Sequence, residues 1–285
     1  MSEPPLREVI RRFGLGANKR LGQHFLLDRN LLARIARSGG DLTGRRVLEI
    51  GPGPGGLTRA LLETDAAAVI AVERDARFLP ALGELAAGAG GRLRVVHDDA
   101  LALNERALGP PFEVVANLPY NIATPLWLKW LDRLDLFTGF TLLLQKEVAL
   151  RLAAVPGGAD WGRLAVKTSR LVTARRLFDV PARAFVPPPK VTSSVLRLVP
   201  RPAPLAVVDA TAFDRVLAAA FGQRRKMLRT SLRALGGDPA ALLATAGIDP
   251  TARPETLDVP AFARLAHALA GAQVQTEVSS SRHRP

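Results

Sequence analysis

The sequence predicts an α/β protein, with a mostly parallel sheet that carries helices on both faces and a small all-α domain at the C-terminal end. The first observation is that short apolar runs typical of buried strands alternate with amphipathic helical segments through the first half of the chain. The second is a glycine-rich turn directly after the first apolar run. The third is a proline-rich break at 200–204, after which the pattern is purely helical.

The apolar runs predict the strands of the sheet. Because helical segments separate the first five runs, these strands are expected to be parallel, with ligands binding at their carboxyl ends. Two later strands are expected to add an antiparallel edge. The five predicted parallel strands lie at 47–50, 69–72, 93–96, 113–116 and 140–144, and the two edge strands at 173–180 and 194–199.

The chain is expected to divide into four segments. Residues 1–27 form a basic, irregular arm, 28–200 the α/β domain, 201–272 the helical domain, and 273–285 a polar tail that we expect to be disordered. Asp28 is placed to cap the first helix of the α/β domain. Helices of the C-terminal domain are predicted at 210–221, 224–235, 239–246 and 259–270.

Composition narrows the class of protein. The 285 residues contain no cysteine, no apolar stretch long enough to cross a bilayer, and no secretory signal at the N-terminus, which favours a soluble cytoplasmic protein without disulfides. A formal net charge of +13 indicates a polyanionic partner, although the Arg-rich bias of a GC-rich genome would also raise it. The excess lies in the second half, since residues 161–200 hold eight Lys or Arg against one Asp.

The glycine-rich turn predicts a nucleoside cofactor. Gly51 begins a turn through residue 56 that lets the backbone approach a ligand closely. Glu73, at the end of the second predicted strand, is placed to accept hydrogen bonds from both ribose hydroxyls, and Asp99, after the third, from the adenine amine of the cofactor. Because such a turn is shared by nicotinamide and S-adenosylmethionine proteins, it does not choose between them.

The tetrapeptide Asn-Leu-Pro-Tyr at 117–120 follows the fourth predicted strand at the same edge of the sheet. Transfer of a methyl group to an adenine amine is difficult because the nitrogen lone pair is delocalised into the ring. The Asn117 side-chain oxygen and the Leu118 carbonyl are suitable acceptors for that amine, and Tyr120 can stack on the base. Such a site works by positioning and dipoles, so we expect no metal.

Seven motifs in order resemble the ribosomal RNA adenine dimethyltransferases, most closely the bacterial small-subunit type. The resemblance runs from about Lys19 to about Leu232 and implies a Rossmann-like methyltransferase fold with S-adenosylmethionine as the cofactor. It also implies N6-dimethylation of two neighbouring adenines in a hairpin loop near the end of small-subunit rRNA, during ribosome biogenesis. The motifs lie at 21–26, 49–53, 72–75, 117–122, 144–148, 185–191 and 221–226.

The resemblance assigns roles to particular residues. It implies that Phe185 forms a second aromatic wall opposite Tyr120, and that His24 contacts the cofactor where some relatives have Asn. The implied catalytic set is Asn117, Leu118, Tyr120 and Phe185. The arm at 1–27 is expected to contribute to the cofactor site. The implied cofactor contacts are His24, Leu26, Gly51, Glu73, Asp99 and Asn117.

A basic helix beginning at Gln223 is predicted to grip RNA phosphates. No acid interrupts residues 221–235, which argues against an ordinary solvated face. The predicted RNA-binding residues are Lys190, Arg224, Arg225, Lys226 and Arg229.

Two aromatic residues are assigned to the core instead. Trp127 and Trp130 share one helical face with leucines, so we expect them to be buried.

Three alternatives remain open from the sequence. The first is the related large-subunit methyltransferase type that confers macrolide resistance, which also carries an Asn-x-Pro-Tyr motif. The second is a mainly non-catalytic RNA-binding assembly factor, and the third is a nicotinamide enzyme, which would leave residues 117–120 and the basic segment unexplained. We expect a monomer that acts on small-subunit rRNA in the assembling subunit, without a membrane or a metal.

Overall fold

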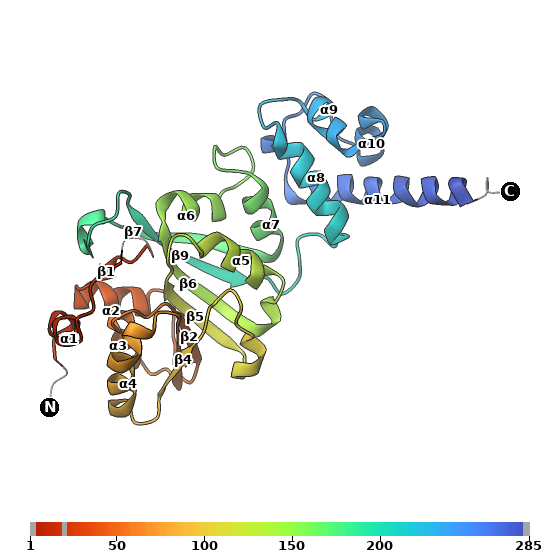
Figure 1. Ribbon diagram of the computed structural model, residues 1–285. Helices are drawn as coiled ribbons and strands as arrows, with labels where there is room; N and C mark the ends of the chain where they lie inside the picture. The colour runs from red at the N-terminus through yellow and green to blue at the C-terminus, as the bar shows by residue number, and fades with distance from the viewer. Residues whose placement is uncertain (1–3, 19–21, 282–285) are drawn as a thin grey trace. The chain divides into compact units, whose positions relative to one another are not determined.

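The computed structural model describes residues 4–18 and 22–281, with side chains to residue 272. Its main feature is a seven-stranded sheet with the strand order β4-β3-β2-β5-β6-β9-β7 (Figure 1). A separate two-stranded pairing joins β1 to β8. The strands are β1 (Phe25–Leu26), β2 (Arg46–Ile50), β3 (Ala68–Glu73), β4 (Leu93–His97), β5 (Phe112–Asn117), β6 (Phe137–Gln145), β7 (Val172–Val180), β8 (Phe185–Val186) and β9 (Ser193–Pro200).

The strand directions confirm the predicted α/β class. The strands β4, β3, β2, β5 and β6 pair in parallel, while β9 pairs antiparallel with β6. The chain runs outward in one direction from β2 through β3 to β4, and then returns to add β5 on the other side of β2. The carboxyl ends of β2 and β5 therefore form the point where the strand order reverses, which is where open α/β sheets bind ligands.

Helices cover both faces of the sheet. On one face, Ile35 of α2 and Leu61 of α3 belong to one buried cluster with Val47 and Leu143 of the strands. On the other face, Trp127 and Trp130 of α5 are buried against Phe140, which confirms that these tryptophans are core. The helices are α1 (Leu6–Arg12), α2 (Arg29–Arg37), α3 (Gly56–Leu62), α4 (Leu79–Gly88), α5 (Ala123–Leu131) and α6 (Lys146–Leu152).

The described chain divides into two compact units whose boundary differs from the sequence prediction. The first unit is Met1–Ala149 with Ala174–Pro200, and the second is Leu150–Thr173 with Arg201–Pro285. Residues 150–173, expected within the α/β domain, join the second unit because their apolar side chains pack there. Trp161 is fully buried in the helical cluster, and its indole nitrogen donates to the Leu257 carbonyl at 2.8 Å.

The second unit is helical, as predicted, with two differences in element bounds. The predicted helix at 224–235 begins only at Leu228, because α8 ends at Gly222 and residues 223–226 form turns. Residues 273–281, expected to be disordered, continue the last helix, and they contain no glycine or proline that would interrupt it. Residues 282–285 lie outside the described chain. The helices are α7 (Arg163–Leu171), α8 (Ala210–Gly222), α9 (Leu228–Ser231), α10 (Pro239–Ala246) and α11 (Val259–Ser281).

The N-terminal arm is more regular than expected. Where the sequence predicted irregular structure, α1 forms over Leu6–Arg12 and buries Val9. Asp28 caps α2 as predicted, since its side chain accepts from the amides of Asn30 and Leu31. Among the described helices, none is long and apolar enough to cross a membrane.

Candidate active site

A cavity of about 410 Å³ lies at the carboxyl ends of β2, β3, β4 and β5, where the strand order reverses. Its volume is in the range of small-molecule and cofactor sites. The segment around β1 also contributes to its lining, so residues distant in sequence meet here. The predicted site residues that line the cavity are His24, Leu26, Gly51, Glu73, Asp99, Asn117, Leu118 and Tyr120.

The turn after β2 has the backbone that only glycine adopts readily. Gly51 and Gly53 have φ of +67° and +55°, in the left-handed region. A side chain at Gly51 would also contact the ring of Pro119, at 3.4 Å. The glycines therefore bring the backbone of the turn close to the segment after β5, and both line the cavity.

Glu73 is held rigidly at the end of β3. One carboxylate oxygen accepts from the amide of Gly53 at 3.0 Å, and the other accepts from the amide of Asp75 at 2.8 Å. Burial raises the pKa of Glu73 above its usual value, while these two backbone donors act in the opposite direction. Each oxygen keeps a second lone pair, so the carboxylate can accept two further hydrogen bonds from a diol in the cavity.

Asp99 has a partner that the sequence did not reveal. Its carboxylate lies 3.1 Å from Nη1 of Arg74, and it also accepts from the amide of Leu101 at 3.0 Å. Arg74 follows β3 and lines the same cavity. A base bound beside Asp99 would therefore also meet an exposed guanidinium.

The segment after β5 combines free acceptors with an aromatic ring. The amide of Leu118 donates to the Leu143 carbonyl at 3.2 Å, which ties the segment to β6. Among the described residues, the side-chain amide of Asn117 makes no hydrogen bond, so its oxygen is available to a ligand. Burial raises the pKa of the Tyr120 phenol, which therefore stays neutral at physiological pH.

His24 contacts two parts of the site at once. Its ring stacks on Tyr120 with centroids 5.7 Å apart, and its Nδ1 lies 2.7 Å from the carbonyl oxygen of Pro187. Since a carbonyl only accepts, Nδ1 must carry the hydrogen. His24 also lines the cavity, where the sequence predicted a contact with the cofactor.

Ser193 is a site residue that sequence reasoning missed. It lies at the start of β9, is fully buried, and its hydroxyl is 2.8 Å from the Tyr120 hydroxyl. This hydrogen bond joins residues 73 positions apart and anchors the phenol oxygen of Tyr120. No sequence signal could have found it, because a serine in a strand carries no motif by itself.

Glu49 was also missed, although the glycine motif contains it. Its side chain is 1% exposed, lines the cavity, and in the described part of the chain its Oε2 has no hydrogen-bond partner. Burial raises the pKa of this carboxyl to about 8. The sequence did carry a signal for this residue, because an acidic residue inside an apolar strand, directly before the glycine turn, is expected to be buried beside the site.

Two predicted residues lie outside the cavity lining. Phe185 is 2% exposed and pairs through β8 with Leu26 of β1, so its ring packs in the core. Lys190 is exposed, in the segment that joins β8 to β9.

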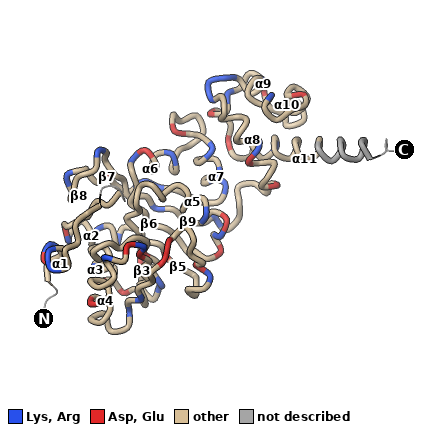
Figure 2. Tube along the Cα trace, viewed as in Figure 1, with Lys and Arg blue, Asp and Glu red and all other residues tan. Residues whose placement is uncertain are grey.

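The predicted phosphate-gripping residues belong to the second unit. Arg224, Arg225 and Lys226 are exposed on the turn before α9, and Arg229 is exposed within it; Figure 2 shows this run of basic residues. The guanidinium of Arg224 donates to the Ala159 carbonyl. The basic residues are therefore carried by a turn and a short helix, which corrects the predicted single helix.

The lining fits S-adenosylmethionine on two structural grounds. Glu73 offers two acceptors at one end for a ribose diol, and the unpaired Oε2 of Glu49 is a buried acceptor that a cationic group would satisfy. Gly51 and Gly53 of the turn also line the cavity and present only backbone there.

Comparisons with known proteins identify the family of the chain. A family model described as ribosomal RNA adenine dimethylase matches residues 14–270. The chain is 57% identical to a protein from Rhodospirillum rubrum named ribosomal RNA small subunit methyltransferase A, over 93% of this chain and 92% of that protein. A protein of the same name from Xanthobacter autotrophicus is 56% identical over 94% of each chain.

Two solved structures resemble the whole fold. One is a dimethyladenosine transferase from Plasmodium falciparum, with a TM-score of 0.74 and 26% identity over 85% of this chain and 96% of that one. The other is the 23S rRNA methyltransferase ErmE, with a TM-score of 0.65 and 29% identity over 86% of this chain and 99% of that one. By the family match and these identities, the chain belongs to the ribosomal RNA adenine dimethylase family.

Proposed function

We propose that this chain transfers methyl groups from S-adenosylmethionine to the N6 amines of two adjacent adenines, in the hairpin loop near the 3′ end of small-subunit rRNA in the assembling subunit. The observation that carries the proposal is the set of free acceptors and the aromatic ring at 117–120, in one cavity with the ribose-binding geometry of Glu73. The names of the relatives support the choice of small-subunit rRNA.

The residues act by positioning rather than by acid–base chemistry. The cofactor supplies a methyl group on a positively charged sulfur. Asn117 and the Leu118 carbonyl accept hydrogen bonds from the amine, which concentrates electron density on its nitrogen and orients the lone pair. Tyr120, neutral and held by Ser193, stacks on the base and keeps water from its face.

The remaining roles follow from where each side chain lies. His24 supports the Tyr120 ring and contacts the cofactor from the cavity lining. Phe185 would serve as a second wall only if its ring turned out of the core, so its direct role is to hold β1 beside the cavity. Exposed basic residues at 190, 224–226 and 229 contact RNA phosphates, and the protein acts as a cytoplasmic monomer.

The experiment that tests this function is mass analysis of rRNA nucleosides. Purified protein is incubated with methyl-labelled S-adenosylmethionine and unmethylated small or large ribosomal subunits, and RNA digests are scored for N6,N6-dimethyladenosine. We expect label at two adjacent adenines of small-subunit rRNA. Because ErmE is a large-subunit methyltransferase by name, label confined to large-subunit rRNA would establish that alternative instead.

Replacing Glu73 by Ala should weaken S-adenosylmethionine binding by about a hundredfold or more, because two charge-assisted hydrogen bonds of about 1.5–3 kcal/mol each are lost. Isothermal titration calorimetry measures the loss. Glu63→Ala, which removes an exposed acid paired with Arg29, is the matched control and should bind normally. A Glu73→Ala protein with near-normal cofactor affinity contradicts the assignment. If that variant lost methylation but still supported subunit maturation in cells, methylation would not be the essential activity.

Ser193→Ala and Tyr120→Phe should each lower kcat about three- to tenfold with little effect on cofactor affinity, since each removes one partner of a hydrogen bond worth about 1 kcal/mol. The double variant should lose no more than either single variant, because both changes remove one interaction. Ser194→Ala is the control, a neighbouring buried serine that bonds Asp179 instead. Additive losses in single-turnover kinetics would refute the positioning role.

The cofactor-free protein should lose stability as pH rises from about 5 to 8, and the loss should level off above 8. Glu49 has a folded pKa of about 8, raised by burial from its usual value of 4.5, so the stability linked to its proton is fully present below 4.5 and is lost by the time pH has risen through 8. Glu49→Gln should flatten this dependence of the unfolding temperature in calorimetry. The exposed-site variant Glu63→Gln should keep the wild-type slope, and an unchanged slope in Glu49→Gln would disprove the assignment.

A further inference from the structure

The helix α2 carries a polar stripe on the side away from the cavity. Asn30, Ala33, Arg34 and Arg37 follow the i, i+3, i+4, i+7 spacing of one helical face, and all but Ala33 are exposed. Leu32 lies two residues before Arg34, about 200° around the helix, and lines the cavity. One helix therefore borders the cavity with one face and carries two arginines on the other.

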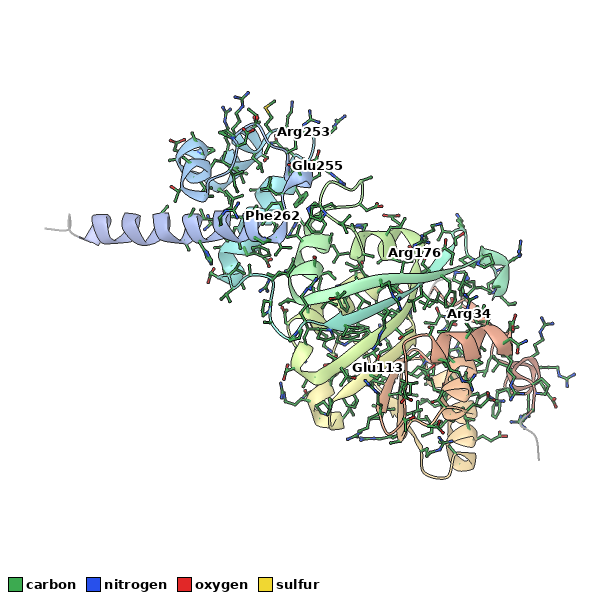
Figure 3. All side chains as sticks on the ribbon, turned by 180° about the vertical axis from the view of Figure 1, so that it is seen from behind. Arg34, Glu113, Arg176, Arg253, Glu255 and Phe262 are labelled. Carbon is green, nitrogen blue, oxygen red and sulfur yellow. The ribbon has the colours of Figure 1, made fainter. Side chains whose placement is uncertain are left out.

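This stripe forms a shallow groove with β7, the edge strand of the sheet. The groove is lined by the stripe together with Ser38, Leu177 and Phe178. The guanidinium carbon of Arg34 lies 3.7 Å from the centroid of the Phe178 ring. Stacking fixes the plane of the guanidinium and leaves its N–H donors at the edge for a ligand. Figure 3 shows Arg34 and Arg176 on neighbouring elements, α2 and β7.

The charge around the groove is positive and not neutralised. In the described part of the chain, neither Arg34 nor Arg37 pairs with a carboxylate. Asp179, the acid of β7, is engaged by Lys146, Ser194 and Arg176, and the Lys146 hydrogen bond contributes most to lowering its pKa. No acid occurs within α2 itself.

We propose that this groove, which we call the α2–β7 groove, docks the phosphate backbone of the substrate rRNA at a distance from the reacting base. The proposal rests on the proposed function. Two guanidiniums without a carboxylate partner among the described residues, one of them held flat on an aromatic ring, and the side-chain amide of Asn30 match a chain of phosphates. The groove and the cavity belong to the same compact unit, so this contact aligns the RNA with Tyr120.

Salt-dependent RNA binding by charge-removing variants tests the groove. Arg34→Gln, Arg37→Gln and the double variant are compared with Arg94→Gln, an exposed arginine of β4 at the opposite edge of the sheet. The probes are protein-free unmethylated small-subunit rRNA and whole unmethylated small subunits, at 50–200 mM salt. Each groove variant should reduce the slope of log affinity against log salt by about one. In the double variant, the loss of affinity between 50 and 200 mM salt should therefore be about tenfold smaller.

The outcomes separate the docking surface from its alternatives. Arg34→Lys, which keeps the charge but loses the stack, should keep the salt slope, and normal S-adenosylmethionine binding by every variant shows an intact fold. Unchanged slopes in the groove variants, or equal effects from Arg94→Gln, overturn the proposal. Weakened binding to whole subunits with unchanged binding to bare rRNA overturns it in favour of a ribosomal protein. Failure of the wild-type protein to methylate rRNA is a separate result that refutes the proposed function alone.

Discussion

The parallel pairing of β2 with β5 is the constraint on which the site depends. Val47 and Leu48 of β2 lie beside Glu113 and Val114 of β5, so the two strands end at the same level. The glycine turn after β2 then meets the segment that starts at Asn117, and Gly51, whose φ of +67° favours glycine, lies beside the ring of Pro119. A shift of register would separate Glu73, the proposed ribose acceptor, from Asn117 and Leu118, the proposed acceptors of the amine, although each segment would keep its own local structure.

The sequence predicted well those elements and site residues that have a local sequence pattern. Short apolar runs predicted every strand of the seven-stranded sheet to within a few residues, and glycine and strand-end positions placed Gly51, Glu73 and Asn117 in one cavity. These features were predictable because each depends on the conformational preference of its own residues and not on contacts with distant segments. The fold of the central sheet follows from them through the rules of strand connection.

The rest depended on contacts between distant segments. The bond from Ser193 to Tyr120 and the ion pair of Arg74 with Asp99 exist only once the strands are assembled. Trp161 is an apolar residue that either unit could bury in its core, so periodicity could not reveal that its segment packs with the helical unit. At residues 223–226, Gly222 ends α8, and helix propensity alone misled the prediction of one continuous basic helix.

His24 joins the two halves of the proposed site. Its ring stacks on Tyr120, its Nδ1 donates to the carbonyl of Pro187, and the residue lines the cavity. In the proposed function the cofactor contacts this ring and the base stacks on Tyr120, so both ligands would bear on one pair of stacked rings. The affinities for cofactor and RNA would then be linked, and linkage is reciprocal: whatever factor the cofactor applies to adenine binding, adenine applies equally to the cofactor.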